Sequence, residues 1–302
     1  MNKIVRIGTR ESKLAVIQAE LVANAIQKHH PEIEIKIVTM KTTGDTILDA
    51  TLDEIGGKGV FIKELVLALR NGIVDICVHS YKDMPAEDDP DFPVVALSSR
   101  EDPRDVLILP QKSESAHPNP EKPVGCSSKR RQCQFLQLYP HNTVEPIRGN
   151  VLTRLEKLDR GEFSALVLAA AGIKRLGLWE RASRIFAINE IIPACCQGIL
   201  AVQGRKGEDY RYLAEYNDRD SRDAAIAERA FTTTINLGCG APAGVFAEIT
   251  GEDTLFVRAM VADSNNTIYR GEITGNRQDA ASLGIAVAEI LSEKMSKGSV
   301  RE

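Results

Sequence analysis

Two adjacent stretches decide the fold class: V-F-I-K-E-L-V-L-A-L-R at residues 60–70 and V-D-I-C-V-H at residues 74–79. The first has the apolar spacing of a helix, and the second is a short apolar run typical of a buried strand. Upstream, residues 3–7 and 33–38 alternate between polar and apolar side chains, with a helical pattern between them. The resulting order of strand, helix, strand, helix, strand predicts a parallel sheet that is covered by helices.

A second α/β series begins near residue 105. Residues 106–109 and 165–169 are apolar strand candidates, and G-C-S-S-K-R-R at residues 125–131 indicates a turn that opens a helix. From about residue 222 the pattern becomes one helix, three alternating strands and a final helix. A chain of 302 residues is too long for one small core, so we expect two α/β domains and a small α+β C-terminal domain.

The composition excludes several classes of function. A net charge of -4 and an aromatic content of 5% argue against a general nucleic-acid-binding surface. No apolar run approaches the roughly 20 residues that span a bilayer, and no apolar signal region follows Met1. The six cysteines contain no C-x-x-C pair, which favours reduced thiols and predicts neither a zinc site nor a disulfide framework. We therefore expect a cytoplasmic protein.

Arginines gather where the predicted strands give way to helices. In doubly wound sheets, ligands bind outside the carboxyl ends of the strands. Helix N-termini and guanidinium groups at such places hold carboxylates or phosphates. Any single arginine of this kind is more simply explained as a solvated surface charge, but six together predict a site for a polyanion. They are Arg10, Arg130, Arg131, Arg148, Arg154 and Arg175.

A lysine and an aspartate follow the buried strand in V-H-S-Y-K-D-M-P at residues 78–85. In the structural interpretation, Lys82 and Asp83 form an ion pair. In the functional interpretation, Lys82 binds an anionic group and Asp83 stabilises a developing cation or moves protons. The spacing of the residues leaves both interpretations open.

Two glycine-rich stretches raise further hypotheses. L-G-C-G-A-P at residues 237–242 displays Cys239 on a turn, where it is either an inert buried thiol or a reactive one. G-G-K-G at residues 56–59 lacks the spacing of a phosphate loop. It is better explained as part of a mobile lid that carries Lys58, because glycines supply hinge freedom.

The order of these motifs resembles the porphobilinogen deaminase family over almost the whole chain. The motifs are I-G-T-R-E-S-K-L-A, G-G-K-G-V-F-I-K-E-L, V-H-S-Y-K-D-M-P, E-D-P-R-D, S-S-K-R-R-Q-C-Q, R-G-N-V-L-T-R-L-x-K-L-D, A-A-A-G-I-K-R-L-G-L and L-G-C-G-A-P-A-G. The resemblance implies two α/β domains similar to type II periplasmic binding proteins, and a small α+β domain that carries the cofactor. The implied bounds are residues 1–99 and 198–217 for domain 1, 103–193 for domain 2 and 220–302 for domain 3.

The resemblance also implies an activity. Enzymes of this family are transferases of tetrapyrrole biosynthesis, also called hydroxymethylbilane synthases. They add four porphobilinogen units stepwise to a covalently bound dipyrromethane primer, with loss of ammonia, and release hydroxymethylbilane. The implied protein is a cytoplasmic monomer without nucleic-acid or membrane partners, and its product passes to uroporphyrinogen-III synthase.

Site residues follow from the resemblance position by position. Cys239 matches the cysteine that carries the dipyrromethane through a thioether, and Asp83 matches the catalytic carboxylate. The side chains implied to bind cofactor and substrate carboxylates are Arg10, Ser12, Lys82, Ser127, Ser128, Arg130, Arg131, Arg148, Arg154 and Arg175. Gly172, Gln197 and Cys126 are implied to line the cleft, and Asp45 and Lys58 to be contact residues of a mobile loop at residues 42–59.

The chain departs from the family pattern at a few positions. Cys126 and Lys129 replace a Thr and a Leu-like residue, Cys196 replaces the Gly that usually precedes Gln-Gly, and the cofactor motif reads L-G-C-G-A-P rather than G-G-C-x-x-P-I. We expect the five cysteines apart from Cys239 to be small buried side chains, and for Cys126 partial exposure in the cleft is left open as an alternative.

Two other functions compete with this one. The first is an anion-binding protein without catalysis, because the arginines explain ligand capture equally well. Cys239 separates the two, since a pure binding protein needs no displayed thiol. The second, a pyridoxal- or nucleotide-dependent transferase, finds no convincing phosphate loop in the sequence.

Overall fold

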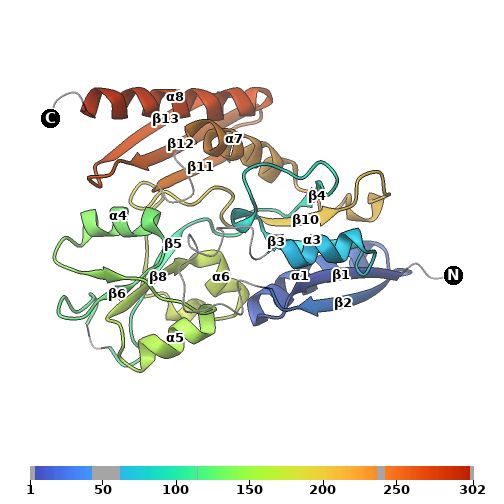
Figure 1. Cartoon of the computed structure of the whole chain (residues 1–302), viewed down its shortest axis with the longest axis horizontal. Coiled ribbons are helices and arrows are strands. Elements are labelled where there is room, and N and C mark those ends of the chain that lie inside the picture. The colour runs from blue at the N-terminus through green and yellow to red at the C-terminus, as the bar shows by residue number, and fades with distance from the viewer. Residues whose placement is uncertain (1–3, 43–61, 114, 237–241, 300–302) are drawn as a thin grey trace. The chain divides into compact units, whose positions relative to one another are not determined.

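The computed structural model describes residues 4–42, 62–113, 115–236 and 242–299 (Figure 1). The chain divides into two compact units, each built from separate segments. The first unit comprises Met1–Glu101 and Gly198–Arg222, and the second comprises Asp102–Gln197 and Asp223–Glu302. Among the described helices, none is both long and apolar enough to cross a membrane.

A five-stranded mixed sheet forms the centre of the first unit, in the order β2-β1-β3-β10-β4. Its strands are β1 (Ile4–Arg10), β2 (Glu34–Met40), β3 (Ile76–Ser80), β4 (Val94–Leu97) and β10 (Leu200–Gly204). The three strands predicted from the N-terminal pattern are confirmed, and β1 pairs in parallel with both β2 and β3. The parallel arrangement expected of these three strands is therefore confirmed, and the sheet is extended by β10, which returns from much later in the chain and pairs antiparallel with β3 and β4.

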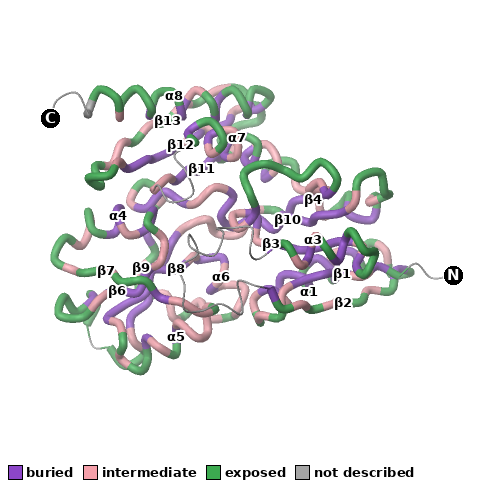
Figure 2. Tube along the Cα trace, viewed as in Figure 1, coloured by how far each residue is buried: buried purple, intermediate pink, exposed green. Residues whose placement is uncertain are grey.

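Helices cover both faces of this sheet because strand side chains alternate between the faces. Helix α1 (Lys13–His29) packs Val22 and Ile26 against Val5 and Ile7 in one core cluster. Helix α3 (Lys63–Arg70) buries Leu65 and Leu69 in a second cluster, together with Cys77 of β3. Strand β3, buried over Ile76–His79, lies between these two layers (Figure 2).

The second unit contains a five-stranded sheet whose order, β7-β6-β8-β5-β9, repeats that of the first. Its strands are β5 (Asp105–Ile108), β6 (Val124–Gly125), β7 (Val144–Glu145), β8 (Ala165–Ala169) and β9 (Arg184–Ile185). β6 is parallel to β7 and β8, whereas β5, which enters from the crossing segment, is antiparallel to β8 and β9. Each sheet thus has three parallel strands, then an antiparallel strand, then an edge strand.

Three helices cover this second sheet: α4 (Lys129–Leu138), α5 (Val151–Asp159) and α6 (Ala170–Arg175). Phe135 of α4 packs on the face formed by Leu107 and Val167. Helices α5 and α6 pack on the opposite face, against Val106 and Leu166. The predicted helix in residues 125–138 and the predicted strand at residues 165–169 are therefore confirmed.

The C-terminal part of the second unit has the predicted order of one helix, three strands and one helix. It consists of α7 (Arg219–Ile235), β11 (Ala243–Ile249), β12 (Thr254–Ala262), β13 (Ile268–Asn276) and α8 (Ala280–Ser299), and its three strands form an antiparallel sheet. Val257 and Ala259 face a core with α7 and α8, whereas Met260 and Ala262 face Cys133 of α4. The predicted fold class, two α/β domains and a small α+β domain, is confirmed.

A glycine allows the two helices of this C-terminal part to pack closely. A Cβ atom on Gly284 of α8 would lie 2.1 Å from the backbone oxygen of Ala227 on α7. Any side chain at this position would force the two helix backbones apart.

Candidate active site

In the first unit, the carboxyl ends of β1 and β3 lie at the same edge of the sheet because the two strands are parallel. Arg10 is the last residue of β1, and the three-residue 3-10 helix η2 (Tyr81–Asp83) follows β3 directly. Lys82 and Asp83 are both partly exposed there. Topology therefore brings Arg10 to the same sheet edge as Lys82 and Asp83, which are neighbours of each other but lie far from Arg10 in the sequence.

Two serine hydroxyls contact helix α1 near this edge. Ser12 caps the helix, and its Oγ accepts a hydrogen bond from the backbone N–H of Ala15 at 3.4 Å. Gln18 donates from Nε2 to Oγ of Ser80 at 2.9 Å, which joins α1 to the end of β3. Ser12 thus has a structural task as an N-cap in addition to its predicted binding role.

A buried histidine stands directly behind Lys82 and Asp83. His79 of β3 is 7% exposed, and burial lowers its pKa from 6.5 to about 4. Asp83 opposes this shift and Arg10 adds to it, so both side chains are close enough to act on the imidazole. His79 is therefore neutral at neutral pH and adds no positive charge beside Asp83.

Replacing His79 by glutamine is expected to reduce the loss of stability in mild acid. Below pH 6.5 the unfolded chain takes up a proton that the folded chain binds only near pH 4. The free energy of unfolding of the native protein should therefore fall by roughly 3 kcal/mol as the pH falls from 6.5 to about 4. Above pH 6.5, His79 should not change this free energy. Denaturant unfolding at about pH 7.5 and about pH 4.5 measures the difference. If the free energy of unfolding of His79→Gln falls by as much between these two pH values as that of the unchanged protein, His79 is not the source of the loss.

In the second unit, three parallel strands end at one edge, and most of the remaining predicted residues follow these ends. Ser127 and Ser128 come after β6, Arg148 after β7 and Gly172 in the helix after β8. Parallel pairing of β6 with both neighbours places these segments side by side. Ligands of open α/β sheets bind at such edges.

Local hydrogen bonds fix the shape of this edge. Ser127 Oγ donates to the carbonyl of Ile147 at 2.6 Å and accepts from its N–H at 2.9 Å, which joins the segment after β6 to that after β7. Ser128 caps α4. Arg154 donates from Nε to the Gly149 carbonyl at 2.8 Å, while Arg148, Arg154 and Arg175 are all partly exposed.

Arg130 and Arg131 lie deeper, where both form ion pairs with Asp105 of β5. Arg130 is 5% exposed and Arg131 is 8% exposed, and Asp105 is fully buried. Arg130 Nη1 lies 2.8 Å from Asp105 Oδ2, and Arg131 Nη2 lies 2.8 Å from Oδ1. Two guanidinium groups against one carboxylate leave one positive charge in excess.

The environment of Asp105 keeps this carboxylate ionised. Burial by itself raises its pKa, but the two arginines and a hydrogen bond from Gln197 outweigh burial and lower the pKa to about 2. Gln197 also donates to the Pro103 carbonyl at 2.7 Å. The amide of Gln197 therefore holds the start of β5 in place by hydrogen bonds to Pro103 and Asp105, at the point where the chain enters this unit.

The structure gives the exposure of three side chains for which the sequence raised expectations. Cys126 is 2% exposed and belongs to the core cluster around Phe135, so the expectation of a small buried side chain is confirmed and the alternative of partial exposure in the cleft is wrong. Burial raises the pKa of this thiol. Cys195 was expected to be buried like the remaining cysteines, but it is only partly buried. Gln197, predicted to line the cleft, is 1% exposed.

Several predicted residues lie outside the described part of the chain. These are Cys239 and the loop residues Asp45 and Lys58. Asp105, in contrast, is described but was missed as a site residue. Its only sequence signal is its place in the E-D-P-R-D motif, because the residues it pairs with are distant in the chain.

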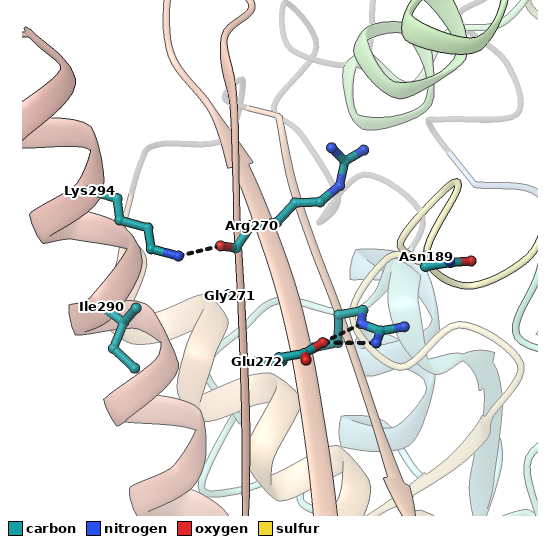
Figure 3. Close-up of a pocket in the computed structure, with 7 residues that line it drawn as sticks. Asn189, Arg270, Gly271, Glu272, Ile290 and Lys294 are labelled. Carbon is teal, nitrogen blue, oxygen red and sulfur yellow. Dashed lines mark hydrogen bonds and ion pairs between the residues drawn. The ribbon is translucent and has the colours of Figure 1, made fainter.

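A separate pocket of about 390 Å3 lies on the C-terminal sheet and α8 (Figure 3). Its three cationic side chains have partners: Arg258 pairs with Glu272 at 2.8 Å, and Lys294 donates to the carbonyl of Arg270 at 2.7 Å. The side chain of Arg270 donates to Oε1 of Gln137 at 3.0 Å. None of its lining residues is among the predicted site residues.

Comparison with known proteins identifies the family. The family model described as porphobilinogen deaminase, dipyromethane cofactor binding domain, matches residues 5–212, and that of the porphobilinogen deaminase C-terminal domain matches residues 223–293. Porphobilinogen deaminase of Alkaliphilus oremlandii is 55% identical over 94% of this chain and 95% of that protein. Porphobilinogen deaminase of Acetivibrio thermocellus is 54% identical over 94% of this chain and 96% of that protein. Among solved structures, this chain is similar to the BenM effector binding domain, with 12% sequence identity and a TM-score of 0.42. The match covers 72% of this chain and 89% of the BenM domain. The chain belongs to the porphobilinogen deaminase family.

Proposed function

We propose that the strand-end side chains of each unit bind carboxylates of the cofactor and substrate, and that Asp83 is the catalytic carboxylate. Family membership makes the protein a transferase that joins porphobilinogen units on a dipyrromethane cofactor to form hydroxymethylbilane. The proposal concerns which side chains perform this reaction. The observation that carries it is the gathering of cationic and hydroxyl side chains at the ends of parallel strands.

The donor set fits the chemistry of the cofactor. Every pyrrole of the growing chain carries an acetate and a propionate, so the bound molecule is strongly anionic. Guanidinium groups bind carboxylates in a bidentate manner, and a serine hydroxyl donates one hydrogen bond. To donate to a carboxylate, Ser127 must release the carbonyl of Ile147, to which its hydroxyl donates in this structure. The residues we assign to this task are Arg10, Ser12, Lys82, Ser127, Ser128, Arg130, Arg131, Arg148, Arg154 and Arg175.

Arg130 and Arg131 support this assignment even though both are buried. Asp105 neutralises one of their two charges and holds both guanidinium groups in place. The remaining positive charge lies in a region with little water, where its attraction for a carboxylate is stronger than at the surface. We assign Asp105 as a positioning residue for this pair.

Asp83 has the position that a catalytic carboxylate needs. It lies at the end of β3, partly exposed, with the anion-binding Lys82 as its neighbour. Its carboxylate accepts hydrogen bonds from pyrrole N–H groups and offsets the positive charge that develops as ammonia leaves. The neutral imidazole of His79 leaves that negative charge available to the substrate. When bound, the dipyrromethane supplies the pyrrole carbon at which the chain grows.

The wider assignments belong to the same proposal. We assign domain 1 to residues 1–99 and 198–217, domain 2 to residues 103–193 and domain 3 to residues 220–302. The protein acts as a monomer in the cytoplasm and passes its product to uroporphyrinogen-III synthase. A reducing compartment is supported by the five described cysteines, all of which are thiols rather than disulfides.

Changing Cys239 to alanine is expected to abolish cofactor attachment. Intact-protein mass spectrometry should find the unchanged protein heavier than its sequence by one dipyrromethane, whereas the variant should have its sequence mass and no activity. Cys133→Ala is the matched control, because Cys133 is a buried thiol of α4 with a pKa raised by burial to about 11. An adduct that persists in the Cys239 variant would overturn the assignment.

A further inference from the structure

A pair of adjacent cysteines meets a buried glutamate just before the chain leaves the second unit. The Sγ atoms of Cys195 and Cys196 are 3.5 Å apart. Glu228 of α7 is fully buried, and one of its carboxylate oxygens lies within 4.8 Å of both sulfur atoms. Cysteine spacing predicts no metal site here, because the third group comes from a helix that begins more than twenty residues later in the chain.

Backbone hydrogen bonds hold the glutamate in a fixed orientation. Oε2 of Glu228 accepts from the N–H of Cys196 at 2.5 Å, and Oε1 accepts from the N–H of Ala247 on β11 at 2.8 Å. Carboxylates that bind metals are commonly oriented by such outer hydrogen bonds. A carboxylate oxygen has two lone pairs, so one that accepts from the backbone can also bind a cation.

The geometry of the two thiols favours a bridging metal over a disulfide. Cα atoms of consecutive residues are about 3.8 Å apart, which is below the range of about 4.4 to 6.8 Å that disulfides span. Zinc–sulfur bonds of about 2.3 Å at a tetrahedral angle place two sulfur atoms about 3.8 Å apart. The observed Sγ–Sγ separation of 3.5 Å is close to that value.

We propose that Cys195, Cys196 and Glu228 form a binding site for Zn²⁺, with water as the fourth ligand. Two Zn–S bonds and one Zn–O bond form as about five of the six waters of the hydrated ion leave and one remains bound, and the two thiols release their protons to solvent. Partly buried Cys195 provides the path by which the ion enters. The bound ion links the segment that precedes Gln197 to α7.

A glycine variant tests the site without disturbing the fold. Cys196 has a φ of 59°, a conformation that glycine adopts without strain, so Cys196→Gly should fold and lose one ligand. Titration calorimetry of the cofactor-loaded, metal-free protein with zinc should find one ion per chain. Both Cys196→Gly and Cys195→Ser should bind zinc at least about tenfold more weakly, since each loses a thiolate ligand. Cys133→Ser, which changes a thiol outside the cluster, should leave the affinity unchanged.

Cobalt provides a second readout that identifies the ligands. Co²⁺ bound to thiolates shows sulfur-to-metal charge-transfer absorption, which we expect in the unchanged protein and in Cys133→Ser. The band should be absent in the double variant that carries both Cys196→Gly and Cys195→Ser. Undiminished zinc affinity in both cysteine variants, or cobalt binding without the thiolate band, would overturn the proposal. Neither readout depends on turnover, so the result is independent of the role assigned to Asp83.

Discussion

The Asp83→Asn enzyme is expected to turn over porphobilinogen about 100- to 1,000-fold more slowly than the unchanged enzyme, the usual cost of losing one preorganised electrostatic group. Asparagine keeps the size of the side chain and can still accept a hydrogen bond. It carries no negative charge, so it cannot offset the cation that forms as ammonia leaves. The fold should be unaffected, because Asp83 is partly exposed in the short helix after β3.

The measurement compares steady-state turnover with cofactor content in the same preparations. Asp91→Asn is the matched control, because Asp91 is an exposed aspartate of the same unit, outside the strand-end set. We expect Asp83→Asn to retain the dipyrromethane mass and the control to retain full activity. Near-normal turnover in Asp83→Asn would show that Lys82 and Asp83 are the structural pair that spacing alone also permits.

The second large effect concerns stability rather than rate. Asp105→Asn should lower the free energy of unfolding by about 3 to 5 kcal/mol, the usual cost of removing one partner from a buried ion pair. The change removes the carboxylate that the two buried guanidinium groups of Arg130 and Arg131 share. Burial already lowers the pKa of Arg130, so the uncompensated site is costly to form.

A more exposed ion pair of the same unit provides the comparison. Asp159 and Arg181 pair at 2.8 Å, but their side chains are 30% and 15% exposed. Asp159→Asn should therefore cost less than about 1 kcal/mol. Denaturant unfolding of both variants measures the contrast. Equal costs would mean that the Asp105 cluster is no more important to stability than a surface pair.

The elements with strong periodicity could be predicted from the sequence, and those with long-range partners could not. Helix α3 and strand β3 follow directly from local apolar spacing. Strand β10 has an equally apolar sequence, but its antiparallel place beside β3 depends on a return of the chain from the other unit. Local patterns do not contain that information, since pairing direction is set by the connection between strands.

The candidate site divides in the same way. Arg10, Lys82 and Asp83 were predicted at strand ends, and the structure puts β1 and β3 in parallel with these ends at one edge. Burial was not predictable, because it depends on what packs above a residue. Local spacing left both burial and partial exposure open for Cys126, and packing against the cluster around Phe135 decided for burial.

The sequence by itself determined the order of strands and helices, the family, and the residue types that surround an anionic ligand. Tertiary structure alone decided which of these residues share a charge and which meet across the fold. Asp105 joins Arg130 and Arg131, and Glu228 meets Cys195 and Cys196. The physical reason is that ion pairs and metal ligands depend on distance in space, which the spacing of residues along a chain does not specify.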